Sequence, residues 1–173
     1  MQLEEKAKAM AHALHCRQYR KDKATPYIRH PEAVVGLLKS IGIKDEDILC
    51  AAWLHDVVED CCVAKETIEE TFNPNIARIV GALTRDVDRH SYKNRIQNAD
   101  FPVKIIKLAD YIHNCFDLNK KGVSKEMIQR KVSDYKFYTG IAEELNPYLC
   151  SLISHYLEPY LEKKDFSLAT DSE

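Results

Sequence analysis

The chain has 173 residues, of which 45% are hydrophobic and 30% charged, and its formal net charge is −2. That length suits one domain with a substantial core, and the charge gives no electrostatic reason to expect a nucleic-acid partner. With five glycines and six prolines, the chain has too few turn residues for a many-stranded β-protein. We therefore expect an all-α fold, a compact multi-helix bundle. We expect a single domain at residues 1–163 and a flexible tail at 164–173.

Nothing in the chain predicts a membrane span or export. It has no apolar run of about 18 residues, and its start, MQLEEKAKAM, resembles a charged helix rather than a signal peptide. We therefore expect a cytoplasmic protein without a membrane partner. The six cysteines lack the paired spacing of a zinc ribbon, and we interpret them, including the adjacent pair Cys61 and Cys62, as free thiols of a reducing compartment.

The hydrophobic periodicity predicts helices along the whole chain. The first is expected at residues 2–20, and the second begins around Pro31 and stops at Gly42. Asp45 is expected to cap a central helix that ends near Glu59. Further helices are predicted at residues 65–71, 74–83, 102–118, 124–145 and 147–161, with a polar and poorly periodic segment at 84–99.

The stretch AAWLHDVVED, residues 51–60, carries too many polar groups for so apolar a helix. If it is one helix, Glu59 lies one turn beyond His55, and Asp60 lies one turn beyond Asp56. Polar groups on an apolar helix need partners, and histidine beside a carboxylate suggests a metal ion.

Two other polar residues intrude on apolar surroundings in the same way. His30 lies in PYIRHP, and Asp110 lies inside the apolar helix KIIKLADYIHN. Each has an ordinary explanation by itself: His30 as a hydrogen-bonding or capping residue, and Asp110 as a buried acid paired with Lys107. Together with His55 and Asp56 they make two imidazoles and two carboxylates, a set that suits a first-row divalent ion with positions left for water.

The order His30, His55-Asp56, Asp110 resembles that of the HD-domain metal phosphohydrolases. The words around these residues are more specific. Over roughly residues 10–118, the sequence is similar to that of the RelA/SpoT-type alarmone hydrolases. The similar segments are RKD at 20–22 before PYIRHP, then AAWLHDVVED, FNPNIARIVGALT and KLADYIHN. The chain resembles the small, free-standing members most. It departs from them in a loop between Arg20 and His30 that is one residue longer and lacks glycine, and in Tyr111, where a basic residue is usual.

This resemblance implies a helical fold, a bound Mn²⁺ or another first-row divalent ion, and hydrolysis of the 3′-pyrophosphate from ppGpp and pppGpp. It implies that Glu59 and Asp60 position and deprotonate the attacking water. The implied metal ligands are His30, His55, Asp56 and Asp110, and the implied substrate-binding residues are Arg20 and Lys21 for guanine, Asn114 near the sugar and phosphate, and Tyr135.

Two other functions stay open. One is an HD phosphohydrolase for another nucleotide, such as NADPH or a nucleoside monophosphate. The other is a non-catalytic module that binds alarmones, although intact Glu59 and Asp60 favour a catalyst. Each function implies a small nucleotide as the partner, and the oligomeric state is left open. Candidate phosphate-binding cations, each of which also suits a solvated helix face, are Arg89, Lys93, Arg95, Lys104 and Lys107.

Overall fold

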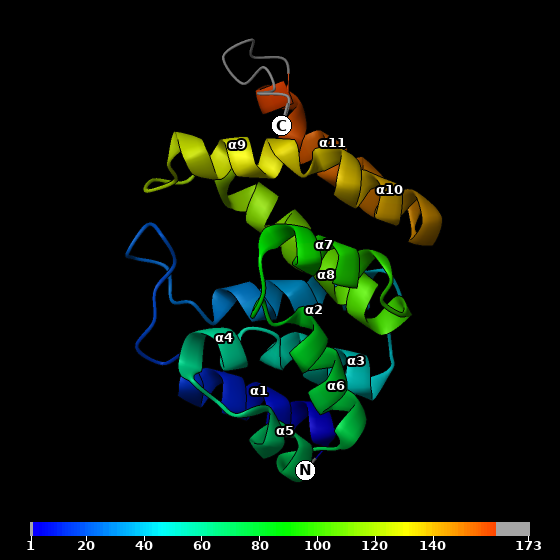
Figure 1. Ribbon diagram of the computed structural model, residues 1–173. Helices are drawn as coiled ribbons and strands as arrows, with labels where there is room; N and C mark the ends of the chain where they lie inside the picture. Colours follow the sequence, from blue (N-terminus) through cyan, green and yellow to red (C-terminus); the bar gives the residue numbers. More distant parts are fainter. Residues whose placement is uncertain (1, 162–173) are drawn as a thin grey trace.

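A computed structural model describes residues 2–161, and these residues form helices joined by short turns, with no β-strand among them (Figure 1). The expected all-α fold is therefore confirmed. The expected tail at 164–173 lies outside the described residues. The elements are α1 (Leu3–Leu14), α2 (Arg29–Ser40), α3 (Glu46–Leu54), α4 (Val57–Cys61), α5 (Lys65–Thr71), α6 (Pro74–Leu83), α7 (Arg89–Gln97), α8 (Phe101–Phe116), the 3₁₀ turn η1 (Asp117–Asn119), α9 (Lys125–Ser133), α10 (Tyr135–Leu145) and α11 (Pro147–Leu161).

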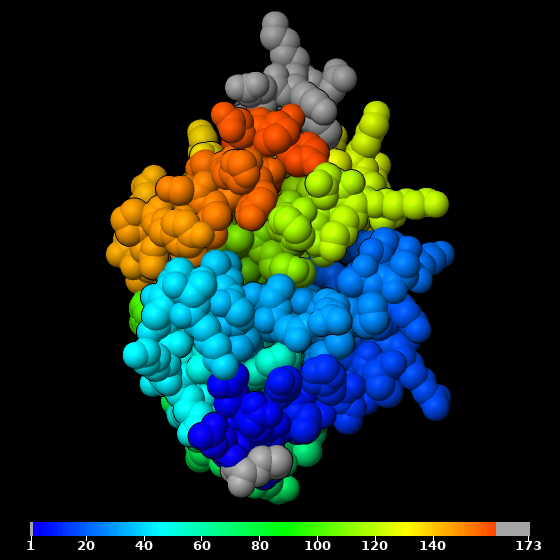
Figure 2. All heavy atoms as spheres, turned by 180° about the vertical axis from the view of Figure 1, so that it is seen from behind, coloured from blue at the N-terminus to red at the C-terminus, as the bar shows by residue number. Residues whose placement is uncertain are grey.

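Helix α8 is the centre of the bundle. It packs against α2, α3 and α6 on one side and against α10 and α11 on the other, while α1 covers α3. Figure 1 shows α1 and α5 at one end of the molecule and α9 to α11 at the other, and Figure 2 shows α1, then α2 and α3, then α10 and α11 as successive bands across the back. Side chains on several faces of α8 are buried, as expected of a helix enclosed by its neighbours.

Side-chain caps set several helix starts. Asp45 accepts a hydrogen bond from the backbone N–H of Ile48, and Ser124 accepts one from that of Met127, as predicted. Asn73 caps α6 in the same way, ahead of the proline in its first turn. These caps satisfy backbone donors that have no partner inside the helix.

The prediction that the first helix runs to residue 20 is wrong. Helix α1 ends at Leu14, and the chain then turns into a loop whose backbone groups bond across to each other: Arg20 N–H to Thr25 O at 2.8 Å and Tyr27 N–H to Gln18 O at 2.9 Å. These donors are thereby satisfied outside a helix, which is the usual requirement for a backbone that leaves one.

The prediction of one continuous helix from residue 45 to 59 is also wrong, because the helix breaks at His55 and Asp56. Nδ1 of His55 lies 2.7 Å from the carbonyl oxygen of Ala52, on the inner side of the chain. That side-chain bond occupies a carbonyl in the last turn of α3 and satisfies it without a further helical residue. The break turns His55 and Asp56 into the interior.

One other boundary differs from the predictions. The helix expected at 124–145 is divided at Asp134, which ends α9 and begins α10. The segment 84–99, for which a loop and a short helix are compatible with the sequence, contains a loop and then α7, whose first turn is capped by the side chain of Asp88. Both α7 and the division at Asp134 contribute residues to the wall of a cavity.

A candidate metal centre at the base of a cationic cavity

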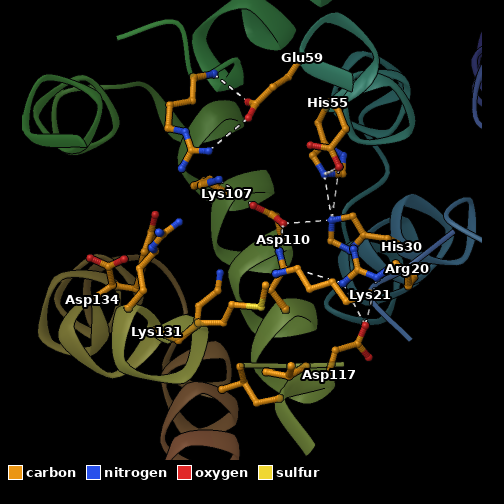
Figure 3. Close-up of a pocket in the computed structure, with 18 of the residues that line it drawn as sticks. Arg20, Lys21, His30, His55, Glu59, Lys107, Asp110, Asp117, Lys131 and Asp134 are labelled. Atoms are coloured by element: carbon orange, nitrogen blue, oxygen red, sulfur yellow. Dashed lines mark hydrogen bonds and ion pairs between the residues drawn. The ribbon is translucent and has the colours of Figure 1, made fainter. Parts of the chain in front are cut away.

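The predicted metal ligands meet at one point, although they come from three places in the chain. Nε2 of His30 lies 3.1 Å from Oδ1 of Asp110, 3.5 Å from Oδ2 of Asp56 and 3.3 Å from Nε2 of His55. Nε2 of His55 is 3.1 Å from the same Asp56 oxygen. Both histidines are buried, with 1% and 4% exposure. Helices α2 and α8 and the break between α3 and α4 thus supply one compact set of donor atoms (Figure 3).

The other nitrogen of each imidazole is already hydrogen-bonded, which leaves the two Nε2 atoms facing each other. For His55 the partner is the Ala52 carbonyl, and for His30 it is Nδ1 of His113, at 2.8 Å. Burial and the neighbouring His30 lower the pKa of His113 to about 4, so that its ring is neutral near pH 7. The hydroxyl of Tyr27 donates to Oδ2 of Asp56 at 2.7 Å.

These residues fit a divalent ion. Facing nitrogen lone pairs and two carboxylates, Asp110 buried and Asp56 partly buried, repel one another unless a cation or protons lie between them. With metal–ligand bonds of about 2.0–2.2 Å, donors at right angles around one ion lie about 3 Å apart, close to the separations found in this centre. His30, His55 and Asp56 form the group of possible ligands with atoms within 4.8 Å of one another, and Asp110 adjoins it through His30.

Asp110 is the most heavily supported of the four. Lys107 donates to its Oδ2 at 2.7 Å, and Asn114 donates to its Oδ1 at 2.5 Å. Burial alone raises the pKa of Asp110, but Lys107 and His30 outweigh it and hold that pKa well below its usual range. Asp110 therefore pairs with Lys107 and also lies beside His30, so a buried ion pair and a place in the candidate metal centre are compatible for this residue.

The metal centre lies at the base of a cavity of about 620 Å³. Although the whole chain has 25 basic and 27 acidic residues, the cavity wall has ten basic residues against six acidic ones. A concentration of cations of this kind attracts polyanions. The basic residues are Arg20, Lys21, Arg85, Arg89, Lys93, Lys107, Lys120, Lys121, Arg130 and Lys131.

Four of these cations have no ion pair with a carboxylate in the part of the chain that the structure describes: Lys21, Lys121, Arg130 and Lys131. Lys131 projects from α9, and its Nζ lies 4.8 Å from the centre of the Tyr111 ring. Burial lowers the pKa of Lys131. Tyr111 also donates to the Lys131 carbonyl at 2.6 Å. The charge that a basic residue at position 111 would bring is thus supplied from α9.

Two acids, Asp134 and Asp117, hold four of the remaining six cations in place, while Arg85 pairs with Glu59 and Lys107 with Asp110. Asp134 is bound by Arg89 at 2.7 Å and by Lys93, and these contacts join α7 to α9 and α10. Asp117 is bound by Arg20 at 2.9 Å and by Lys120 at 2.7 Å. Figure 3 shows Asp134 and Asp117 on opposite sides of the cavity.

The guanidinium of Arg20 is held in place by its neighbours, and a carboxylate balances its charge. Its guanidinium also donates to Asn114 at 3.0 Å, and its centre lies 5.5 Å from that of the Tyr27 ring. Its charge is thus largely balanced by Asp117, with which it makes two hydrogen bonds. A guanidinium held in this way presents its face for stacking.

The loop after Arg20 turns without a glycine. Lys23 takes the left-handed conformation, with φ of 58°. Asp22 supports the turn by accepting from Thr25 Oγ1 at 2.6 Å and from the N–H groups of Ala24 and Thr25, contacts that lower its pKa to about 2. On the far side, Gly122 allows close approach, because a Cβ there would lie 2.3 Å from the Lys21 carbonyl oxygen.

The predicted catalytic pair is divided by the structure. Glu59 lines the cavity beside His55 and Asp56, and its carboxylate accepts a hydrogen bond from the Arg85 N–H at 3.0 Å. Asp60 is exposed and does not line the cavity. It lies beside the Tyr27 hydroxyl, where burial, Asp56 and Asp60 together raise the tyrosine pKa.

Other predicted residues lie elsewhere. Tyr135 does not line the cavity, and its hydroxyl is 3.0 Å from Ser154 Oγ between α10 and α11. Of the candidate phosphate-binding cations, Lys104 and Arg95 also lie outside the wall. Sequence reasoning missed Lys131, which lies on α9 and lines the cavity.

Comparison with known proteins identifies the family of the chain. The HD-domain family model matches residues 7–145, which include all four predicted ligands. The chain therefore belongs to the HD-domain family.

Within that family its relatives are guanosine-3′,5′-bis(diphosphate) 3′-pyrophosphohydrolases. A probable member from Synechocystis is 33% identical over 96% of this chain, which spans only 24% of that longer protein. The MESH1 proteins of Danio rerio and Homo sapiens are 36% and 37% identical over 66% of this chain and 70% of their own length. The solved structure of a metazoan ortholog of SpoT, described as hydrolysing ppGpp, superimposes with a TM-score of 0.79 at 29% identity, over 93% of this chain and 97% of that one. None of the described helices has the length and apolarity needed to cross a membrane.

Proposed function

We propose that this protein hydrolyses the 3′-pyrophosphate bond of guanosine 3′,5′-bis(diphosphate) and related alarmones, with Mn²⁺ as the metal. The single observation that carries the proposal is the cationic cavity, because its base is the set of His30, His55, Asp56 and Asp110. A substrate with two pyrophosphate groups needs a reactive centre and several unpaired cations together. The relatives named for this reaction support the choice of substrate. We also propose that residues 1–163 form one domain.

The four ligands would hold the divalent ion, and Lys107 and Asn114 would keep Asp110 in place for it. When bound, such an ion acts as a Lewis acid that polarises a phosphate oxygen and lowers the pKa of an adjacent water. Oxygen and imidazole donors suit Mn²⁺, and they also suit other first-row ions.

The cations without acid partners are the proposed phosphate-binding groups. Lys131, held over the Tyr111 ring on the wall opposite His30, faces the cavity with its charge unneutralised. A desolvated ammonium of this kind gains more from an anion than a solvated surface lysine does. Lys121 and Arg130 add charge on the side of the cavity formed by α9 and the turn before it, whereas Lys21 belongs to the proposed guanine position.

The guanine is placed against Arg20 and Lys21. Because Asp117 and Asn114 already bind the Arg20 guanidinium, that group is better suited to stack on a base than to bind a phosphate. Asn114 bridges Arg20 and Asp110, and so it connects the proposed base position to the metal ligands.

Glu59 is the proposed proton acceptor. Its carboxylate takes a proton from the water that attacks the phosphorus next to the 3′-oxygen. The bond between that oxygen and phosphorus breaks, the 3′-oxygen takes up a proton and leaves as the hydroxyl of GDP, and the attacked group is released as pyrophosphate that carries the oxygen of the water. The Arg85 N–H fixes the carboxylate in the cavity. Asp60 supports the candidate metal centre indirectly, because it lies beside Tyr27, whose hydroxyl donates to Asp56.

The test is turnover of purified protein loaded with Mn²⁺, given ppGpp, NADPH or guanosine monophosphate in parallel, with products separated by anion-exchange chromatography. The expected result is GDP and pyrophosphate from ppGpp, abolished by a chelator and restored by Mn²⁺. Phosphate release from NADPH or the monophosphate, with ppGpp intact, would establish the other-nucleotide function instead. Binding of ppGpp without release of any product would establish a binding module.

A further inference from the structure

The two histidine ligands are held by different kinds of partner. Nδ1 of His55 faces a backbone carbonyl, a fixed acceptor. Nδ1 of His30 faces Nδ1 of His113 at 2.8 Å, and a ring nitrogen is either a donor or an acceptor, according to which nitrogen of that ring carries the proton. The direction of the second hydrogen bond therefore depends on where the proton of each ring lies.

The surroundings of Nε2 in His30 decide which nitrogen of that ring carries the proton when a metal ion is bound. Among residues 2–161, the polar contacts of that atom within 3.5 Å are with carboxylate oxygens of Asp56 and Asp110 and with Nε2 of His55, the donor set of the candidate metal centre. To bind an ion there, Nε2 of His30 must offer a lone pair, so that the proton of this neutral ring is on Nδ1. Two protonated Nδ1 atoms cannot share a hydrogen bond at 2.8 Å, so His113 must accept through a bare Nδ1.

We propose that His113 is a positioning residue for the metal centre: it accepts the Nδ1–H of His30 and thereby keeps the lone pair of His30 turned toward the other ligands. His113 lies three residues beyond Asp110 on α8, so that this helix provides one ligand and the orienting partner of another. The two rings are 4.9 Å apart at an angle of 40°. The inference rests on the metal-binding role of His30 in the proposed function.

The test compares His113→Phe, which keeps a ring but has no acceptor, with His113→Gln, which restores an acceptor oxygen. The matched control is His155→Phe, an exposed ring on α11 outside the cavity wall. Calorimetric titration with Mn²⁺ alone is expected to show affinity lowered about 10–100-fold in His113→Phe. The loss in His113→Gln is expected to be less than about tenfold, and the control is expected to match wild type.

An affinity of His113→Phe equal to wild type overturns the inference. Wild-type protein that binds no divalent ion overturns the proposed metal role instead, and so the two failures are distinguishable. At saturating Mn²⁺ the KM for ppGpp is expected to be unchanged in His113→Phe; a KM that stays raised would make His113 a substrate contact and refute the positioning role.

A second measurement does not depend on whether the phenylalanine variant folds. Nitrogen-15 NMR of the wild-type imidazoles, loaded with diamagnetic Zn²⁺, reports which ring nitrogen carries the proton. The expected spectrum has His113 protonated on Nε2 and bare on Nδ1, with His30 protonated on Nδ1. A proton on Nδ1 of His113 in the loaded protein would refute the inference.

Discussion

Replacing Glu59 by glutamine tests whether Glu59 accepts the proton of the attacking water while other residues hold the metal. Glutamine keeps the size of the side chain and the oxygen that accepts from Arg85 N–H, but it does not take up a proton from water. General acid–base help is worth about 10²–10⁴ in rate. At 1.36 kcal/mol for each factor of ten, that is about 2.7–5.5 kcal/mol of transition-state stabilisation.

The same change is expected to leave folding and metal binding nearly intact. The Glu59 side chain is 36% exposed, and its ion pair with Arg85 is 3.5 Å long, so that its loss costs less than about 1 kcal/mol of unfolding free energy. Glu59 is also absent from the group of ligand atoms.

The assay is steady-state hydrolysis of ppGpp at saturating Mn²⁺, with calorimetry for the metal. Glu70→Gln, an exposed acid on α5, is the control and is expected to behave as wild type. Asp60→Asn is expected to lose far less kcat than Glu59→Gln, because Asp60 does not line the cavity. A Glu59→Gln enzyme with wild-type kcat, or an Asp60→Asn enzyme with the larger loss, would refute the assignment of the proton acceptor.

Asp56→Ala is expected to abolish both Mn²⁺ binding and hydrolysis, measured by calorimetry and product release; full activity without metal would contradict the site. Gly122→Ala is expected to raise the KM for ppGpp and to leave the affinity for Mn²⁺ unchanged. The φ of 89° disfavours alanine, and the new Cβ, 2.3 Å from the Lys21 carbonyl oxygen, would force the loop after Arg20 to move. An unaltered KM would show that this loop does not bind substrate. Burial raises the pKa of the Cys50 and Cys115 thiols to about 12, so iodoacetamide at pH 8 is expected to label exposed Cys16 in the native protein and to reach the two buried thiols only after unfolding, as read by mass spectrometry.

The candidate metal site could be proposed from sequence because its residues are polar within apolar segments. His55, Asp56 and Asp110 are such residues, and the structure brings their side chains close to that of His30. Hydrophobic periodicity in the sequence identifies such residues before the positions of the helices in space are known. The all-α fold followed from composition and periodicity in the same way.

What the sequence did not reveal depends on side-chain contacts, some of them local and others between distant segments. The break after Leu54 results from a side-chain bond to Ala52, and uninterrupted helical periodicity gives no sign of it. On α4, the adjacent side chains of Glu59 and Asp60 leave the helix about 100° apart, and Glu59 lines the cavity whereas Asp60 does not. Lys131 looked like one more lysine on a charged helix until the fold placed it beside Tyr111.

The acids in the cationic wall bear on how the cavity keeps its shape without a bound anion. Asp134 and Asp117 each hold two cations, and without them the like charges on α7, α9 and the loop after Arg20 would repel one another. Because these counter-ions are part of the chain, they offset that repulsion in the empty cavity. The proposed nucleotide substrate would then spend little of its binding free energy on ordering the wall.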